Sequence, residues 1–370
     1  MLNLYFDKCE DIHAQYEAFP FQFSLANDLV EEDYNVALIG VKSELNETNP
    51  GSATAPDAIR QHLYPLQGGF NNIKIKDLGN LKKGKSLSDT YAALKAVTEE
   101  LLSADVLPIV IGGSHELTNP LFEALKEKLP QITTTVVDRK LDYPFTSSQI
   151  FDANAFIDRI IEDPHNEEFK LFGYQGYYCP KPFLCELQKM KCQLVRVGEM
   201  FRNIASTEPL LRDTDLLSID MSAVRHADSP GFAYAIPNGL TGEEICQLSH
   251  YAGLSDRISL FGLFEANPAF DDSDQTASLA AQIIWHFLEG LDNRYGDYPK
   301  REIKSYEERV AIFPSESEKN IHFFHNRMNG RWWIKIPTQT GDKIYACLPS
   351  DYQTACEGDI PEIWMRYYMN

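Results

Sequence analysis

Residues 133–142 read Thr-Thr-Thr-Val-Val-Asp-Arg-Lys-Leu-Asp. β-branched residues favour strands, so this stretch predicts a buried strand that ends at Asp138, with Asp142 four residues further on. Two carboxylates just past a buried strand are typical of half of a site for a hard metal ion. Lys140 between them argues against a metal site, because a protonated ammonium has no lone pair to donate to a metal ion. Whether the chain binds a catalytic metal therefore depends largely on Lys140.

Similar short runs recur along the chain, and several are apolar on both faces, as in parallel strands that are covered by helices. Between many of them, apolar residues spaced three and four apart predict helices over 88–103, 116–128, 153–162, 241–253 and 273–291. Ser86 or Ser88 is expected to cap the first helix, and Thr241 with Glu244 forms a capping-box pattern. This alternation predicts a doubly wound α/β domain. Its eight predicted strands are residues 35–41, 73–78, 106–111, 132–138, 169–173, 192–197, 215–220 and 258–265.

The chain divides into three predicted parts: an N-terminal extension over 1–34, the α/β domain over 35–295, and a small β-rich C-terminal appendage over 300–370. In the appendage, runs 321–325 and 331–336 flank a turn and predict a hairpin, and 343–348 predicts a further strand. We expect Trp332, Trp333 and Trp364 to hold the appendage against the main domain, where it offers a surface for partner or homo-oligomer contacts.

The composition narrows the classes of function. The chain has 370 residues and a formal net charge of −20, which argues against nucleic acid or an anionic membrane as a partner. Its seven cysteines form no Cys-x-x-Cys pair, which indicates reduced thiols in a cytosol. The start lacks a signal-peptide pattern and no apolar run reaches membrane-spanning length, so we expect a cytoplasmic protein.

Chemistry-bearing residues gather where predicted strands end. His115 follows Gly112-Gly113, Asp138 and Asp142 follow the strand quoted above, and Asp220 and Glu265 end two later strands. Ligands of doubly wound sheets bind beyond the carboxyl ends of the strands, so these side chains are expected at one edge. Each is weak evidence alone, because an Asp at a strand end is commonly a helix cap. His165, His250, His286, His322 and His325 have no partner at a ligand spacing and are interpreted as structural.

Taken together and in this order, the strand ends resemble the arginase, agmatinase and formimidoylglutamase family of ureohydrolases over residues 35–291. The resemblance implies a three-layer α/β/α fold around a mostly parallel sheet of eight strands. It extends to the segment 49–60, Ser229-Pro230-Gly231, Asn238-Gly239-Leu240-Thr241, and the stretch from Glu265-x-Asn267-Pro268 to Asp274, Thr276 and 279–281.

That family holds two manganese ions that activate a water molecule for attack on a guanidinium or amidine carbon. By resemblance, the first ion would be held by His115, Asp138, Asp142 and Asp220. Glu265 matches the acid that pairs with the guanidinium-like group of the substrate, which implies a small amidine or guanidino ligand.

The ligands that the family uses only for its second ion are replaced here by Lys140 and Ser222. Ser114 and Gln175 replace an aspartate before the first histidine and a histidine of a substrate loop, and Arg225-His226 stand where the family has Asp-Pro. Converging carboxylates repel one another unless a cation intervenes. We therefore expect the Lys140 ammonium near the second metal position, bridging Asp138 and Asp220, with Arg139 and Arg225 adding charge.

Three hypotheses follow, in this order of preference. The first is a pseudoenzyme with a degenerate metal site, which serves as a scaffold, regulator or small-ligand binder and has no metal at full occupancy. The second is a formimidoylglutamase-like or arginase-like hydrolase of linear amidine or guanidino C–N bonds that uses one manganese at His115, Asp138, Asp142 and Asp220. The third is another kind of hydrolase with Lys140 as base or nucleophile, which is disfavoured because neighbouring acids raise the pKa of a lysine.

Overall fold

The computed structural model describes residues 4–7, 23–25, 34–43, 49–144, 151–190, 192–298, 306–312, 320–339 and 341–368. Most of the predicted N-terminal extension lies outside these residues. Its described parts include β1 (Phe6–Asp7) and β2 (Phe23–Leu25), which both pair with β4 (Ile75–Leu81) at one side of the main sheet. The extension therefore adds two short strands to the domain that follows it.

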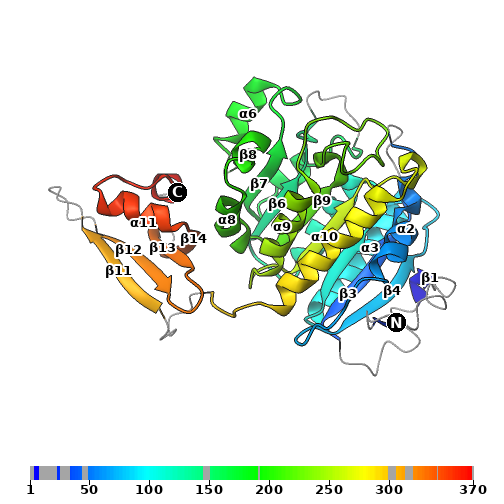
Figure 1. Ribbon diagram of the computed structural model, residues 1–370, viewed down its shortest axis with the longest axis horizontal. Helices are drawn as coiled ribbons and strands as arrows, with labels where there is room; N and C mark the ends of the chain where they lie inside the picture. Colours follow the sequence, from blue (N-terminus) through cyan, green and yellow to red (C-terminus); the bar gives the residue numbers. More distant parts are fainter. Residues whose placement is uncertain are drawn as a thin grey trace.

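All eight predicted strands form in one large, mostly parallel sheet (Figure 1). The order across the sheet is β1-β4-β3-β5-β10-β9-β6-β7-β8, with β2 beside β4. The β4–β1 pair is antiparallel, whereas the pairs among the eight predicted strands are parallel. The remaining strands are β3 (Val36–Val41), β5 (Leu107–Ile111), β6 (Ile132–Val137), β7 (Asn166–Tyr174), β8 (Cys192–Arg196), β9 (Leu216–Asp220) and β10 (Leu260–Phe264).

Helices cover both faces of the sheet, which gives the expected three layers. The layer with α9 and α10 faces the viewer in Figure 1. One layer contains α2 (Ala55–Leu63), α7 (Val197–Met200), α8 (Glu208–Arg212), α9 (Gly242–Gly253) and α10 (Gln275–Asp292), and the other contains α3 (Leu87–Ser103), α4 (Thr118–Leu125), α5 (Asp158–Ile161) and α6 (Lys181–Leu187). Short 3-10 turns are η2 (Ser52–Thr54), η3 (His115–Leu117), η4 (Ile204–Thr207), η5 (Met221–Ala223) and η6 (Pro268–Phe270).

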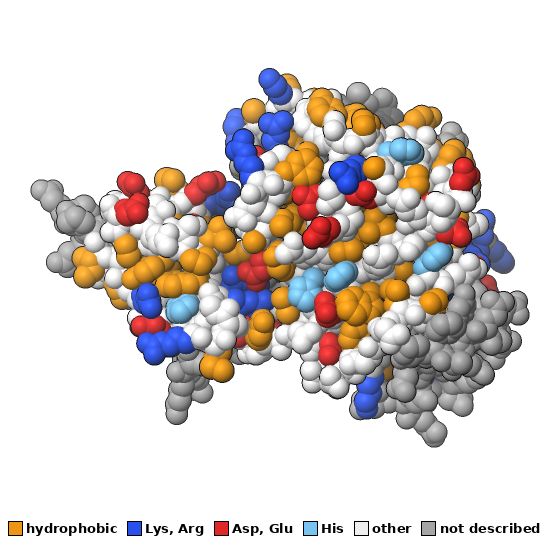
Figure 2. Space-filling model, viewed as in Figure 1, with side chains coloured by type: hydrophobic (Ala, Val, Ile, Leu, Met, Phe, Trp, Pro, Cys, Tyr) orange, Lys and Arg blue, Asp and Glu red, His pale blue; other side chains and the backbone are white. Residues whose placement is uncertain are grey.

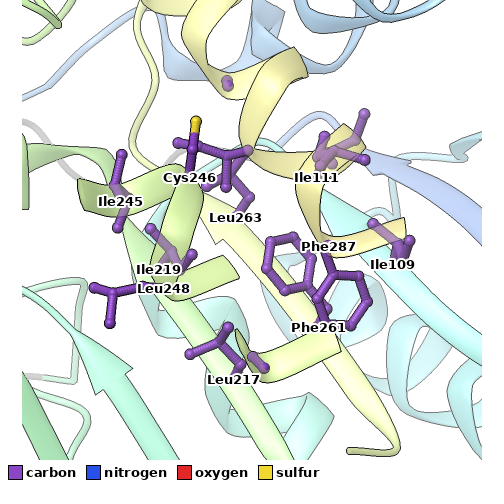
Figure 3. Close-up of a cluster of buried hydrophobic side chains, with 14 of the residues drawn as sticks. Ile109, Ile111, Leu217, Ile219, Ile245, Cys246, Leu248, Phe261, Leu263 and Phe287 are labelled. Atoms are coloured by element: carbon purple, nitrogen blue, oxygen red, sulfur yellow. The ribbon is translucent and has the colours of Figure 1, made fainter. Parts of the chain in front are cut away.

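The core between the sheet and α9 and α10 combines alternate residues of the central strands with apolar residues of the two helices (Figure 3). Because successive strand residues point to opposite faces, their neighbours in sequence enter the second core under α3 and α4. Phe261 of β10 stacks on Phe287 of α10 with ring centroids 4.4 Å apart, and both are fully buried. Truncating either ring to alanine would cost about 3–5 kcal/mol.

The capping predictions are confirmed for two helices. Ser86 caps α3 through a reciprocal pair of hydrogen bonds with Asp89, and Thr241 caps α9 in the same way with Glu244. The helix predicted over 153–162 is largely wrong, since only α5 forms there. Asp152 Oδ1 instead accepts a hydrogen bond from the Asn154 amide at 2.7 Å, a turn bond that competes with helix formation.

The appendage folds as a separate antiparallel sheet in the order β11-β12-β13-β14. The predicted hairpin and third strand are confirmed. The strand over 306–312 was not predicted, because its glutamates and arginine read as a polar segment. The elements are β11 (Tyr306–Ile312), β12 (Asn320–Asn326), β13 (Trp332–Thr338), β14 (Gly341–Cys347), α11 (Pro349–Cys356) and α12 (Glu362–Tyr367).

An arginine of the main domain, Arg212, contacts two tryptophans of the appendage. Arg212 of α8 donates from Nη1 to the Trp332 carbonyl at 2.9 Å, and its guanidinium lies 4.8 Å from the Trp333 ring centroid. The side chains of Trp332 and Trp364 belong instead to the apolar core of the appendage itself. The contact between the Trp333 ring and Arg212 is thus of the kind that the sequence suggested. The domain boundaries themselves stay a prediction.

In the described part of the chain, no helix is both long enough and apolar enough to cross a bilayer.

Candidate metal centre

The turn after β5 places His115 at the carboxyl edge of the sheet. Gly112 and Gly113 both have positive φ, at 90° and 72°, which glycine adopts without a steric cost. Neither position has room for a side chain, since a Cβ on Gly112 would lie 2.2 Å from Pro56 Cγ and one on Gly113 2.3 Å from the Ser43 carbonyl oxygen. The glycine pair therefore turns the chain tightly and begins η3 with a buried histidine.

Two contacts fix the orientation of the His115 ring. Its Nε2 lies 3.0 Å from the Ser218 hydroxyl, which in turn lies 2.6 Å from the Thr118 hydroxyl. The ring of Phe156 packs edge-on against the imidazole at 4.9 Å. A proton on Nε2 leaves the Nδ1 lone pair free, as a metal ligand requires.

Three carboxylates converge on that Nδ1 atom. It lies 3.7 Å from Asp138 Oδ2, 3.4 Å from Asp142 Oδ2 and 3.4 Å from Asp220 Oδ2, and all four side chains are buried. This convergence follows from topology, because β5, β10, β9 and β6 are neighbours in the sheet and run parallel. The residues that the sequence singled out at three strand ends are therefore brought together.

The donor set fits one divalent ion. Atoms that share an ion through bonds of about 2.1 Å stand about 3 to 3.5 Å apart, close to the distances seen here. Among the described residues, His115 Nδ1, Asp138 Oδ2 and Asp142 Oδ2 are buried and have no hydrogen-bond partner. Such atoms carry a large desolvation cost unless something binds them. Three carboxylates and an imidazole suit manganese or a similarly hard ion.

Without an ion, the site holds protons instead. Burial lowers the pKa of His115, but the three surrounding carboxylates outweigh it and hold the pKa well above its ordinary value. Burial together with the charges of Asp142 and Asp220 raises the pKa of Asp138 well above its ordinary value. Burial opposes ionisation of Asp142 too, but the Lys140 charge and His115 bring its pKa down to about 2.

Lys140 contacts a different carboxylate from the two that the sequence suggested. Its Nζ lies 2.8 Å from Asp142 Oδ1 and donates to Asn154 Oδ1, so the expected direct bridge between Asp138 and Asp220 is wrong. The geometric reason is that the backbone turns within 138–142 and brings Asp142 beside the lysine. Burial lowers the pKa of Lys140, but the charges of Asp142 and Asp138 outweigh it and raise the pKa, so the side chain stays an ammonium.

The two arginines do not join this cluster. Arg139 donates to the Tyr234 carbonyl at 2.7 Å and stacks over the Phe232 ring, while Arg225 pairs with Asp228 at 2.9 Å. The expectation that they add charge at the second metal position is therefore wrong.

Ser222 lies directly beside the ligand carboxylates. Its main-chain amide donates to Asp220 Oδ1 at 2.6 Å, and its hydroxyl donates to Asp138 Oδ1 at 3.4 Å. The Lys140 amide donates to the same Asp138 oxygen at 3.1 Å. These bonds occupy the carboxylate oxygens that point away from His115, and they orient the other oxygens toward it.

Glu265 is buried next to the cluster in a left-handed backbone conformation, with φ at 66°. Its Oε1 accepts from the His115 amide at 2.9 Å and its Oε2 accepts from Asn49 Nδ2 at 2.7 Å. Burial and the negative charge of Asp220 raise its pKa to about 8. Strained backbone at a buried carboxylate is typical of functional sites.

Ser114 and Gln175 have partners outside the cluster. Ser114 donates to Glu116 Oε1 at 2.7 Å, and Gln175 Nε2 donates to the Asn238 carbonyl at 2.9 Å. The Tyr177 hydroxyl donates to Gln175 Oε1. Gln175 therefore ties two loops together and cannot exchange a proton as a histidine would.

Three residues of the site were not recognised from sequence. Asn49 and Ser218 lie inside segments that carried the resemblance, but nothing in those segments marks them as partners of Glu265 and His115. Asn154, the partner of Lys140, lies in a segment interpreted as helix, so its role had no sequence signal.

Comparison with known proteins shows which family the chain resembles. Residues 34–289 match the arginase family. A formimidoylglutamase of Staphylococcus aureus (strain JH9) is 21% identical over 252 residues, which cover 66% of this chain and 81% of the relative. Two solved structures share the fold, with TM-scores of 0.67 and 0.66. The first is Trypanosoma cruzi formiminoglutamase with Mn²⁺, which is 21% identical, and the match covers 73% of this chain and 97% of that one. The second is proclavaminate amidino hydrolase from Streptomyces clavuligerus, which is 20% identical, and the match covers 75% of this chain and 97% of that one. The chain therefore belongs to the arginase family.

Proposed function

We propose that the chain is a hydrolase of linear amidine or guanidino C–N bonds that works with one metal ion. The observation that carries this proposal is the buried convergence of His115 Nδ1 with oxygens of Asp138, Asp142 and Asp220. The atoms that face one another there, His115 Nδ1, Asp138 Oδ2 and Asp142 Oδ2, have no hydrogen-bond partner among the described residues, and such buried atoms are costly unless a cation binds them. This reverses the order of preference drawn from the sequence, where the pseudoenzyme came first.

The same four side chains would hold the ion, and the related T. cruzi structure contains Mn²⁺. When bound, such an ion acts as a Lewis acid and lowers the pKa of a water molecule. Ser218 keeps the His115 ring in the orientation that binding needs, while Ser222 and the Lys140 amide orient Asp138 and Asp220. The chain's own residues therefore preorganise the binding site.

Lys140 takes over the electrostatic task of a second ion in this proposal. Its ammonium is fixed between Asp142 and Asn154, so it supplies one positive charge beside the carboxylate cluster. Unlike a metal ion, it cannot coordinate a lone pair from water or substrate. Positioning of the attacking water would therefore depend on the single remaining ion and on the carboxylates around it.

Glu265 is the proposed anchor for the substrate. Each of its oxygens accepts one hydrogen bond from the protein, and a carboxylate oxygen has a second lone pair that could accept from an amidinium N–H. A cationic substrate would favour the ionised carboxylate, which burial and Asp220 disfavour in its absence. The names of the relatives, formimidoylglutamase and amidino hydrolase, support an amidine or guanidino group as the recognised feature.

A second candidate function is binding of the same class of ligand without hydrolysis. The contact of 2.8 Å between Lys140 and Asp142 favours it, because the ammonium occupies one oxygen of a metal ligand. Under this candidate, Lys140 neutralises the cluster and Glu265 still pairs with a cationic ligand.

One experiment separates the two candidates. The full-length protein is stripped with EDTA and reloaded with Mn²⁺, bound metal is counted by mass spectrometry, and product release is followed for formimidoyl, guanidino and amidino substrates. We expect one bound equivalent and turnover of at least one substrate class, both lost in Asp220→Asn. Asp228→Asn is the matched control, because that carboxylate pairs with Arg225 outside the site. Metal uptake without turnover would favour the second candidate, and no saturable uptake would reject the single-metal hydrolase.

A further inference from the structure

We propose that His250, His286 and Glu289 form a second metal site, for a divalent transition ion of the zinc, copper or nickel class. His250 lies on α9, and His286 and Glu289 lie one turn apart on α10, which packs beside it. Ligand atoms of the three side chains all lie within 4.8 Å of one another. The face that α9 and α10 present to solvent shows histidine and acidic side chains gathered together (Figure 2).

The distances match a shared ion. His250 Nδ1 lies 3.2 Å from Glu289 Oε2, and His286 Nδ1 lies 3.6 Å from the same oxygen. Tetrahedral ligands with bonds of about 2.0–2.1 Å to zinc stand about 3.3 Å apart. His250 Nδ1 is itself buried and has no hydrogen-bond partner among the described residues. This nitrogen therefore lies beside a carboxylate and a second imidazole, and none of the described residues forms a hydrogen bond with it.

Close helix packing holds the three side chains at this spacing. A Cβ on Gly290 would lie 2.4 Å from the His250 carbonyl oxygen, and a Cβ on Gly253 would lie 2.2 Å from the Phe287 carbonyl oxygen. The two helix backbones therefore touch directly beside the proposed ligands. Ligands on rigid, closely packed helices lose little freedom on binding, which favours a preorganised site.

The donor set selects a different ion from the one at the carboxylate cluster. Two imidazoles and one carboxylate suit zinc, copper or nickel, whereas three carboxylates and one imidazole suit manganese. Three protein ligands leave a fourth position for water or an added group. A surface hollow of about 820 Å³ borders the site, so that position has room, and the three side chains are reachable from solvent.

Trp285 supplies a local reporter for this site. Its ring lies edge-on to the His286 ring with centroids 5.2 Å apart, whereas the other three tryptophans belong to the appendage. A paramagnetic Cu²⁺ ion on His286 would quench Trp285 fluorescence at this range. Metal bound at the Asp138 cluster does not need to be removed, because Trp285 fluorescence responds to an ion bound at the adjacent His286.

The test is a Cu²⁺ titration of the full-length protein followed by fluorescence, with Zn²⁺ competition. We expect saturable quenching that Zn²⁺ reverses and that Trp285→Phe abolishes. His250→Gln or His286→Gln should weaken the apparent affinity at least about tenfold, since even indirect partners of metal ligands are worth that much. His322→Gln is the matched control, because that histidine has the same exposure as His286 and a single glutamate partner but no second imidazole.

Thermal unfolding gives an independent measurement. A metal that binds only the folded state raises Tm, and the rise grows with metal concentration. We expect Zn²⁺ to raise the Tm of the His322→Gln variant as in the wild type, and to raise that of His250→Gln by a smaller amount. Equal affinity and an equal rise in Tm for the wild type, His250→Gln and His286→Gln would overturn the proposal. Neither readout depends on hydrolysis, so the outcome is separate from that of the proposed function.

Discussion

The Lys140 ammonium lies 2.8 Å from Asp142 Oδ1, while His115 Nδ1 lies 3.4 Å from the other oxygen of the same carboxylate. Asp142 thus faces a fixed cation on one side and the candidate metal position on the other. This division explains why its pKa falls to about 2 while burial and the charges of its neighbours raise the pKa of Asp138.

Removing the ammonium should destabilise the metal-free protein. Lys140→Met leaves Asp142 without its cation, and we expect a loss of about 2 kcal/mol, below the full cost of breaking a buried pair because the lysine side chain is 25% exposed. Urea unfolding with EDTA measures it. Added Mn²⁺ should recover most of the loss. Lys126→Met breaks pairs with Glu123 and Asp163, whose carboxylates are both more exposed than that of Asp142, and should cost less, about 1 kcal/mol. A Lys140→Met protein as stable as the wild type in EDTA would contradict this account.

Restoring the family ligands should restore a second ion. The double variant Lys140→His with Ser222→Asp adds an imidazole and a carboxylate beside Asp138 and Asp220, and we expect it to bind two equivalents of Mn²⁺ where the wild type binds one. Metal analysis after gel filtration measures this. Each single variant is a control that should gain less. If the wild type and the double variant bind the same number of ions, Lys140 and Ser222 are not replacements for a metal site.

The stability of the metal-free protein should fall as pH rises. Because the pKa of Glu265 is raised from 4.5 to about 8, the folded protein keeps a proton that the unfolded chain has lost in this range. Stability therefore declines between pH 4.5 and 8, by at most about 1.4 kcal/mol per pH unit from this group. Asp142 does not contribute to this decline, because its pKa is lowered and its stabilising effect is lost only as pH falls toward 2.

Unfolding free energies across that pH range, in EDTA, provide the measurement. Glu265→Gln should make the slope shallower whatever it does to the absolute stability, and the raised pKa values of Asp138 and His115 should account for the decline that remains. A divalent metal should flatten it in the wild type, since a nearby cation lowers the pKa of a carboxyl group. A slope that Glu265→Gln leaves unchanged would show that another group titrates.

Arg212 should control the attachment of the appendage. Arg212→Met removes the bond to the Trp332 carbonyl, the stacking on Trp333 and a largely buried ion pair with Glu208, at a cost of about 3 kcal/mol. Because the appendage tryptophans report on its folding, their fluorescence should change at lower urea than the far-UV circular dichroism of the main domain. Arg309→Met is the matched control, since that arginine also stacks on a tryptophan but within the appendage. Coincident transitions in Arg212→Met would argue against this anchor.

Local sequence patterns were sufficient to predict the sheet and the residues at its edge. Apolar runs of strand length, separated by helical periodicity, are local features, and the eight predicted strands all form. Once parallel strands are adjacent, their carboxyl ends must share an edge, which brings His115, Asp138 and Asp220 together. The resemblance to the ureohydrolase family then indicated which of the strand ends form one site.

The partners of the individual side chains depend on tertiary packing and could not be predicted from the sequence. A lysine side chain reaches several carboxylates, and the turn within 138–142 directs Lys140 to Asp142 and Asn154. His250 and His286 have no meaningful spacing in sequence, yet the close contact of two helices at Gly253 and Gly290 brings them to one glutamate. Long-range geometry of this kind depends on how finished elements pack, and short-range sequence patterns carry no record of it.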